Sequence, residues 1–174
     1  MDPSGDRFLA GLLLSGASLE QFTAAASLFG LTLSPRQLGQ FEQYLALLLE
    51  WNERLNLTAI REPEEIWVRH FLDSLSCAAA TGNLNHVSLM DVGTGAGFPG
   101  LPLKIAFPDL RLTLVESVAK KTQFLQAVVT ELGLSEVTIL AERAETLGQQ
   151  PEHREQYDWV VARAVAGLPV LLEY

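Results

Sequence analysis

The spacing of apolar residues changes near residue 85. Before that point, leucine and aromatic side chains recur every three or four positions, which is the period of an amphipathic helix. The positions are Leu38, Phe41, Leu45, Leu48 and Leu55. Ser34 and Pro35 precede this run, as an N-cap and a first helical residue commonly do. We expect further helices over Ser18–Phe29, ended by Gly30, and from Pro63 to about Ala80. Residues 1–85 are therefore predicted to form a helical region.

After Asn85, short apolar runs alternate with helical patterns. The predicted strands are Val87–Val92, Leu110–Glu116, Val137–Ala141 and Asp158–Ala162. The predicted helices between them are Phe98–Phe107, Val118–Leu132 and a short one over Arg143–Leu147. Such alternation builds βαβ units and a parallel sheet that helices cover on both faces. Residues 86–174 are therefore predicted to be an α/β domain.

The last residues, Gly167–Tyr174, have the pattern of a new helix and not of a chain terminus. If the sheet had four strands only, the fourth would be an uncovered edge, where unwanted strand pairing can occur. We therefore expect the sheet to be truncated and to lack its C-terminal strands.

Composition limits the class of protein. The 174 residues, of which 48% are hydrophobic, suit one folded domain with a small accessory layer. The apolar stretches are too short for a membrane span, and the acidic opening Met1–Asp6 lacks the basic start of a secretory signal. Because Cys77 is the only cysteine, no intrachain disulfide can form. We expect a cytoplasmic protein with no membrane partner.

The formal net charge of −9, from 21 acidic and 12 basic residues, argues against a general nucleic-acid binder. A local basic patch remains compatible with this charge, because the surface field depends on where the charges lie.

A glycine-rich loop follows the first predicted strand. The apolar run Val87–Met90 leads into Asp91, and four glycines then fall within eight positions: Gly93, Gly95, Gly97 and Gly100. Glycine allows positive φ and lets a ligand approach the main chain closely. A strand, such a loop and then a helix make a nucleotide-type site at the carboxyl edge of a parallel sheet.

Two interpretations of the ligand of this loop are possible, a dinucleotide and S-adenosylmethionine. Gly95, Gly97 and Gly100 formally match the dinucleotide pattern, and Glu116 follows about twenty residues later. Counted from Gly93, the first glycine after the strand, the third glycine position holds Phe98, so the pattern fails there.

S-adenosylmethionine fits these residues better. Asp91 can face the ammonium group of this ligand, whereas an acid at that position opposes a pyrophosphate. Glu116 can accept hydrogen bonds from both ribose hydroxyls. A tight strand–helix turn without any ligand is the least favoured interpretation.

The string Asp91–Leu103 resembles motif I of the bacterial 16S ribosomal RNA guanine-N7 methyltransferases, the RsmG or GidB family. Motif I occurs in many methyltransferases, and the elements that flank it make the resemblance specific to this family. The resemblance covers nearly the whole chain from about Leu31. These elements are Trp51-Asn52, Leu55–Thr58, Val68–Ser74, Leu114–Ser117, Lys120-Lys121, Phe124-Leu125, Arg143–Glu145 and Arg163-Ala164. The resemblance implies a Rossmann-like S-adenosylmethionine-dependent methyltransferase sheet with an N-terminal helical layer.

The resemblance also implies a cofactor, a partner and site residues. The cofactor is S-adenosylmethionine, the partner is 16S ribosomal RNA or the small ribosomal subunit, and no metal is involved. To the loop residues Asp91, Gly95 and Gly97 the family adds the cofactor contacts Gly93, Phe98, Glu116, Ser117, Ala144, Glu145 and Arg163. The candidate RNA contacts come instead from positions on the helical face or near the expected sheet edge, and they are Arg69, His70, Lys120, Lys121, Arg143 and Arg163.

One helical face carries His70, Asp73 and Ser74, at the spacing that brings side chains together. Nothing nearby supplies an oxyanion hole, so a hydrolase triad is not favoured. We expect this polar face to dock the helical region onto the cofactor domain or onto RNA, with His70 in a structural hydrogen bond.

Guanine N7 has a free lone pair, so methyl transfer to it needs alignment and no strong base. Methylation of pyrimidine carbon-5 would need a cysteine nucleophile, but Cys77 precedes the cofactor domain. Exocyclic amino methylation often uses an Asn/Asp-Pro-Pro-aromatic segment, and Val161–Ala164 differs from it. Two other functions stay open: a non-catalytic fragment that binds the cofactor or RNA, and an NAD-dependent oxidoreductase.

Overall fold

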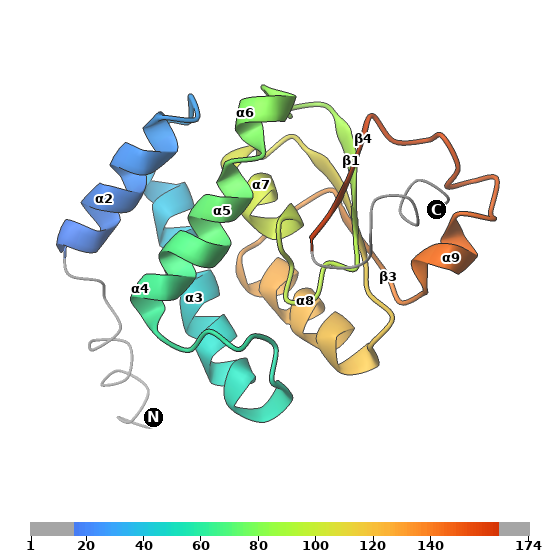
Figure 1. Ribbon diagram of the computed structural model, residues 1–174, viewed down its shortest axis with the longest axis horizontal. Helices are drawn as coiled ribbons and strands as arrows, with labels where there is room; N and C mark the ends of the chain where they lie inside the picture. The colour runs from blue at the N-terminus through green and yellow to red at the C-terminus, as the bar shows by residue number, and fades with distance from the viewer. Residues whose placement is uncertain (1–15, 164–174) are drawn as a thin grey trace.

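The computed structural model describes residues 16–163 and contains one parallel four-stranded sheet (Figure 1). Its strands lie in the order β3-β2-β1-β4. They are β1 (Ser88–Val92), β2 (Arg111–Val115), β3 (Val137–Leu140) and β4 (Trp159–Ala162). Both ends of every strand agree with the sequence prediction to within one residue. The α/β, Rossmann-like fold class is confirmed.

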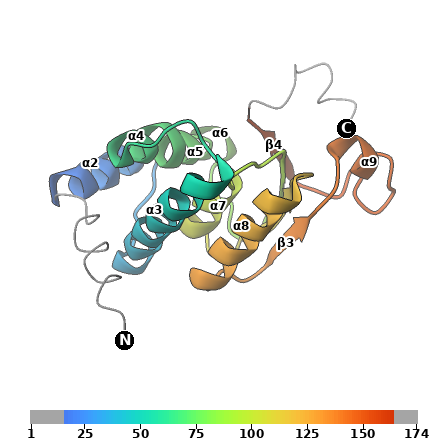
Figure 2. The same cartoon turned by 90° about the horizontal axis from the view of Figure 1, so that it is seen from below.

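Helices lie on both sides of this sheet (Figures 1 and 2). On one side are α7 (Gly100–Ala106) and α8 (Ala119–Glu131), with α3 (Pro35–Leu55) packed outside them. The short α9 (Ala144–Leu147) lies on the other side, where Leu147 joins a small cluster with Met90, Val92 and Val115. All four strands end at one edge, so the loops that follow them meet there.

Helix α3 begins with a capping box, in which the Ser34 hydroxyl and the Gln37 side chain satisfy each other's backbone N–H groups. A row of glutamines on the same helix then contacts the sheet helices. Gln37 donates to the carbonyls of Ile105 and Ala106, at the end of α7. Gln40 donates to the Leu132 carbonyl beyond α8. These bonds satisfy carbonyls that a helix end leaves without a partner, and they fix α3 across α7 and α8.

The remaining helical layer contains α2 (Gly16–Ser27) and a broken segment. The regular helix expected from Pro63 to about Ala80 is wrong in detail. The structure has α4 (Pro63–Ile66), a π-helical turn η1 (Trp67–Leu72), α5 (Asp73–Leu75) and α6 (Ala78–Thr81). A π turn shifts the helical periodicity and often marks a functional site. This turn carries Arg69 and His70, and Asp73 follows it directly.

One hydrophobic core extends from the helical layer into the sheet. Trp67 packs against Phe22, Phe41 and Phe71, with ring centroids 4.6–6.2 Å apart. The same cluster continues to strand residues such as Leu89 and Leu114. Since the packing is continuous, the proposed boundary between residues 85 and 86 stays a prediction.

Burial falls from the centre of the sheet to its flanks. Four of the five residues of β1 are buried, whereas Trp159 and Val160 of β4 are 40% and 58% exposed. The helix pattern at Gly167–Tyr174 lies outside the described residues. Within residues 16–163, no helix combines the length and the apolarity that a membrane span requires.

Candidate functional site

Asp91 forms the floor of the glycine loop and is fully buried near the end of β1. Its Oδ2 accepts hydrogen bonds from the Thr94 hydroxyl (2.6 Å) and from the N–H of Gly100 (2.8 Å). Oδ1 has no hydrogen-bond partner among the described residues. Burial raises the pKa of this carboxyl to about 6. Asp91 therefore ties the end of β1 to the start of α7, and only Oδ1 is left for a ligand.

Glycine is needed at two positions of the loop for different physical reasons. At Gly97 (φ +97°), a Cβ would lie 2.4 Å from Leu101 Cδ1 and 2.6 Å from the Tyr44 hydroxyl. At Gly95 (φ +60°), a Cβ would meet nothing within 4 Å. Gly97 is thus required by packing beneath the loop. Gly95 faces open space from which a ligand can approach the main chain.

Glu116 lies across the loop, directly after β2, and is 6% exposed. Its Oε2 accepts from the Gly95 N–H (3.1 Å), and its Oε1 accepts from the Val118 N–H (2.9 Å). Lys121 Nζ is 3.8 Å from Oε2. A carboxylate offers about four lone-pair positions, so Glu116 can accept further bonds. The structure thus brings Glu116 to the open Gly95 segment, and Ser117 follows it as an exposed residue.

Phe98 connects the loop to the helical layer. Its buried ring stacks on His70 (centroids 4.5 Å apart, planes at 12°) and on Tyr44 (5.5 Å, 20°). The Tyr44 hydroxyl also donates to the Ala96 carbonyl. The residue that breaks the dinucleotide pattern is therefore a packing element between the two regions.

Arg163, directly after β4, joins the same junction. Its Nη1 donates to Asp73 Oδ2 (2.9 Å) and to the Arg69 carbonyl (3.2 Å). Its Nη2 donates to His70 Nδ1 (3.1 Å), and the guanidinium carbon is 5.2 Å from the Phe98 ring centroid. The polar helix face with His70 and Asp73 thus docks onto Arg163 and Phe98, beside the glycine loop. The Arg69 side chain points elsewhere, toward Glu65 at 3.9 Å.

Comparison with known proteins identifies the family. Residues 37–174 match the GidB family model, described as rRNA small subunit methyltransferase G. Three relatives named "Ribosomal RNA small subunit methyltransferase G" come from Roseiflexus sp. (strain RS-1), Alkaliphilus metalliredigens and Bacillus pumilus. They are 55%, 54% and 50% identical to this chain over 156, 145 and 156 residues. The chain belongs to the GidB family.

The alignments cover 90%, 83% and 90% of this chain and 66%, 61% and 65% of the three relatives. The chain therefore spans about two thirds of the length of its GidB relatives.

The other basic candidates follow the strands of this GidB-family sheet at its carboxyl edge. Lys120 and Lys121 lie in the first turn of α8, and Arg143 precedes α9, whose first residues are Ala144 and Glu145. Lys120 and Arg143 are exposed, whereas Lys121 lies beside Glu116. The sheet order places these three residues on the β2–β3 side of the loop and Arg163 on the β4 side.

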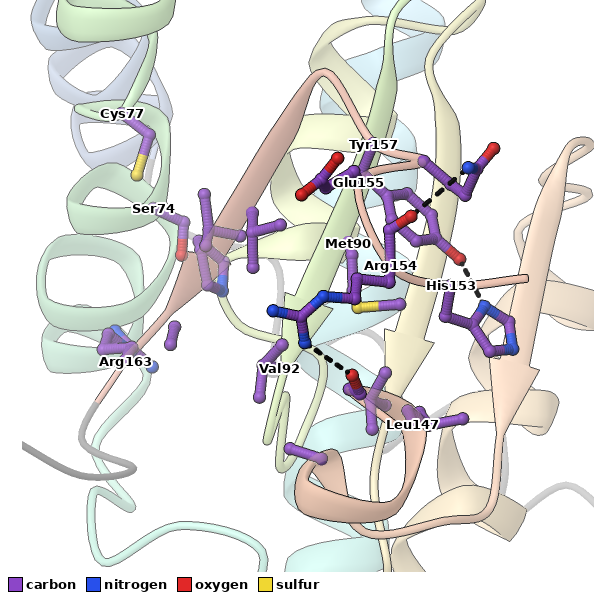
Figure 3. Close-up of a pocket in the computed structure, with 18 of the residues that line it drawn as sticks. Ser74, Cys77, Met90, Val92, Leu147, His153, Arg154, Glu155, Tyr157 and Arg163 are labelled. Carbon is purple, nitrogen blue, oxygen red and sulfur yellow. Dashed lines mark hydrogen bonds between the residues drawn. The ribbon is translucent and has the colours of Figure 1, made fainter. Parts of the chain in front are cut away.

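A cavity of about 760 Å³ lies between α5, β4 and α9 (Figure 3). Val92, Val115 and Leu147 contribute apolar wall, and Pro99 and Arg163 connect the cavity to the glycine loop. This volume is typical of small-molecule sites. No pattern in the sequence predicts the cavity, because its wall combines residues that are distant along the chain.

Sequence reasoning also missed three supporting residues. Tyr44 belongs to the helical apolar pattern, which conceals the role of its hydroxyl. Asn52 pairs with the backbone of Thr58 through bonds of 3.0 Å and 2.9 Å. Asn52 and Thr58 lie in the elements Trp51-Asn52 and Leu55–Thr58, which carried the family resemblance, and this resemblance was the available signal. In the part of the chain that the structure describes, no group of three or more His, Cys, Asp or Glu side chains could hold a metal ion.

Proposed function

We propose that this chain binds S-adenosylmethionine and takes part in methylation of guanine N7 in 16S ribosomal RNA, in the cytoplasm. The observation that carries the proposal is the buried Glu116 carboxylate at the end of β2, hydrogen-bonded to Gly95 where the loop is open. The printed name of the relatives, an rRNA small subunit methyltransferase, supports the reaction class and the RNA partner.

The residues present fit this cofactor. Glu116 offers a carboxylate to the ribose hydroxyls, and the Gly95 backbone leaves room beside it. Asp91 Oδ1, a buried oxygen without a described partner, suits the ammonium group. Arg163 suits the carboxylate at the same end of the ligand. Gly93, Gly97 and Phe98 shape the loop, and Ser117, Ala144 and Glu145 complete the proposed contacts.

When bound, S-adenosylmethionine supplies the methyl group. The chain's own residues would then align this group with the guanine N7 lone pair, which requires no proton removal. Burial raises the pKa of the Cys77 thiol, which makes it a poor nucleophile. The cysteine chemistry of carbon-5 methylation is therefore not supported.

The proposed RNA surface combines Lys120, Lys121 and Arg143 on one side of the loop with Arg69 and Arg163 on the other. Both ring nitrogens of His70 are within hydrogen-bond distance of protein groups, which supports a structural role for this residue over an RNA contact. Phosphate contacts release counterions, so RNA affinity should fall with added salt. Lys120→Ala should weaken RNA binding similarly for all sequences and reduce the salt slope by roughly one. An unchanged slope would remove Lys120 from this surface.

Because the chain spans about two thirds of its relatives, a second function stays in view: cofactor or RNA binding without catalysis. Methyl transfer separates the two. Labelled S-adenosylmethionine is incubated with 30S subunits that lack the modification, with the Roseiflexus relative as the active control. We expect label in 16S ribosomal RNA at N7 of a guanine. An active control and no label from this chain would leave the binding function only.

A further inference from the structure

A chain of side-chain contacts leads from the helical region to Arg163. The Asn52 amide donates to the Thr58 carbonyl and accepts from the Thr58 N–H. Thr58 Oγ1 lies 2.7 Å from His70 Nε2, and His70 Nδ1 accepts from Arg163 at 3.1 Å. Residues that lie more than ninety positions from Arg163 along the chain therefore decide where its guanidinium lies.

The hydrogen bonds fix the protonation state of His70. A guanidinium can only donate, so Nδ1 must be without a proton. The ring proton is then on Nε2 and is donated to Thr58 Oγ1. Burial and the charge of Arg163 lower the pKa of His70 to about 4, which keeps the imidazole neutral. His70 is thus held in one tautomer, with each ring nitrogen bonded to a different part of the molecule.

Asp73 holds the other side of the guanidinium. It shares Arg163 Nη1 with the Arg69 carbonyl, while Nη2 is bonded to His70. The described residues thus account for three of these hydrogen bonds, and a guanidinium has five N–H donors. Among residues 16–163, the two remaining donors, on Nε and Nη2, have no partner and can donate to an anionic group. Arg163 is therefore oriented beside Phe98, and the described residues do not use all of its donors.

We infer that His70 and Asp73 are positioning residues, which direct Arg163 toward the anionic end of a ligand in the glycine loop. Thr58 and Asn52 support His70 in this role. The inference rests on the proposed function, because the anionic group is the carboxylate of S-adenosylmethionine. The helical layer thus contributes to cofactor affinity without contacting the cofactor.

The test is a calorimetric titration of the 174-residue chain with S-adenosylmethionine. His70→Phe keeps a ring on Phe98 but lacks the acceptor, and Asp73→Asn removes the negative charge. Both should weaken binding, by roughly three- to thirtyfold. Asn has an acceptor near the position of Nδ1, so His70→Asn should bind more tightly than His70→Ala. Glu50→Gln, which alters an exposed ion pair on α3, is the matched control and should bind like the wild type.

A double-mutant cycle identifies the route of the effect. In an Arg163→Ala background, Asp73→Asn should cause little further loss, since its partner is already absent. Thr58→Val, which removes only the hydroxyl, provides a second entry to the same cycle if Asp73→Asn fails to fold. Full additivity with Arg163→Ala, or equal affinities for His70→Asn and His70→Ala, would overturn the inference while the proposed function stands. A wild-type chain that does not bind S-adenosylmethionine would overturn the proposed function itself.

Discussion

The glycine loop is held by two regions that differ in construction. The loop floor consists of Asp91, Thr94, Gly97 and Gly100, all buried and bonded to one another or to near neighbours. The Arg163 junction consists of Arg163, His70, Asp73 and Phe98, and it joins residues that are up to 93 positions apart in the sequence. In the Arg163–Asp73 pair, the two side chains are 32% and 54% exposed.

Because of this difference, substitutions in the two regions should affect different properties: folding stability in one and ligand affinity in the other. In the loop floor, any added atom or unpaired charge is enclosed by protein, so substitutions there should cost folding free energy. In the Arg163 junction, solvent screens the Arg163–Asp73 ion pair, so substitutions in this pair should cost little stability. Their effect should appear in cofactor affinity.

The largest effect is expected for Gly97→Ala. The new methyl would lie 2.4 Å from Leu101 Cδ1 at a φ of +97°, which combines overpacking with backbone strain. We expect a loss of about 4 kcal/mol in the free energy of unfolding, measured by urea denaturation. Gly95→Ala is the control, because it has a φ of +60° but open space, and it should lose only about 1 kcal/mol. Equal losses for the two variants would show that the loop floor is not tightly packed.

A second effect separates the two regions by their pH dependence. The folded pKa of Asp91, about 6, is above the usual value of 3.8 for this carboxyl, so wild-type stability is lost as pH rises between these values. Asp91→Asn cannot ionise. Its stability relative to wild type should therefore increase from pH 4 to pH 6, by about 2 kcal/mol. A constant difference in unfolding free energy across this range would refute the burial of a charge at Asp91.

His70 in the junction should show the opposite slope. Its folded pKa of about 4 is below the usual histidine value of 6.5, so it makes the folded chain more stable as pH rises from 4 to 6.5. His70→Phe removes this contribution, and the variant should lose stability relative to wild type over the same range. The effect should be smaller than that of Asp91, because His70 is partly exposed. Parallel curves for His70→Phe and wild type would indicate that His70 titrates normally.

The smallest stability effect is expected for Asp73→Asn. This pair is solvent-exposed, so the free energy of unfolding should change by less than about 1 kcal/mol. A thermal melt with and without S-adenosylmethionine checks both parts of this expectation. The unliganded melting temperature should be nearly unchanged, and the stabilisation by ligand should be reduced. A large drop without ligand would make Asp73 a stability residue.

Much of this fold was predictable from local patterns. The alternation of apolar runs located β1 to β4, and Ser34-Pro35 located the start of α3, because both signals depend on neighbours in sequence. The π turn at Trp67–Leu72 was not predictable, since its residues have an ordinary helical pattern.

For the site too, local sequence patterns predicted individual residues but not the contacts between them. Asp91 and Glu116 were singled out by their place at the ends of strands, but their bonds to Gly100 and Gly95 depend on the path of the loop backbone. The His70–Arg163 bond joins residues 93 positions apart, and single-sequence patterns carry no information about such pairs.

The most direct test of the central claim is a titration of wild type and Glu116→Gln with S-adenosylmethionine, with NAD as the competing ligand. Gln cannot provide a charged pair of acceptors to the ribose hydroxyls. We predict one site for S-adenosylmethionine, at least roughly tenfold weaker binding in the variant, and no binding of NAD. Tight NAD binding without S-adenosylmethionine binding, or equal affinities in the two proteins, would contradict a cofactor site built on Glu116 and the glycine loop.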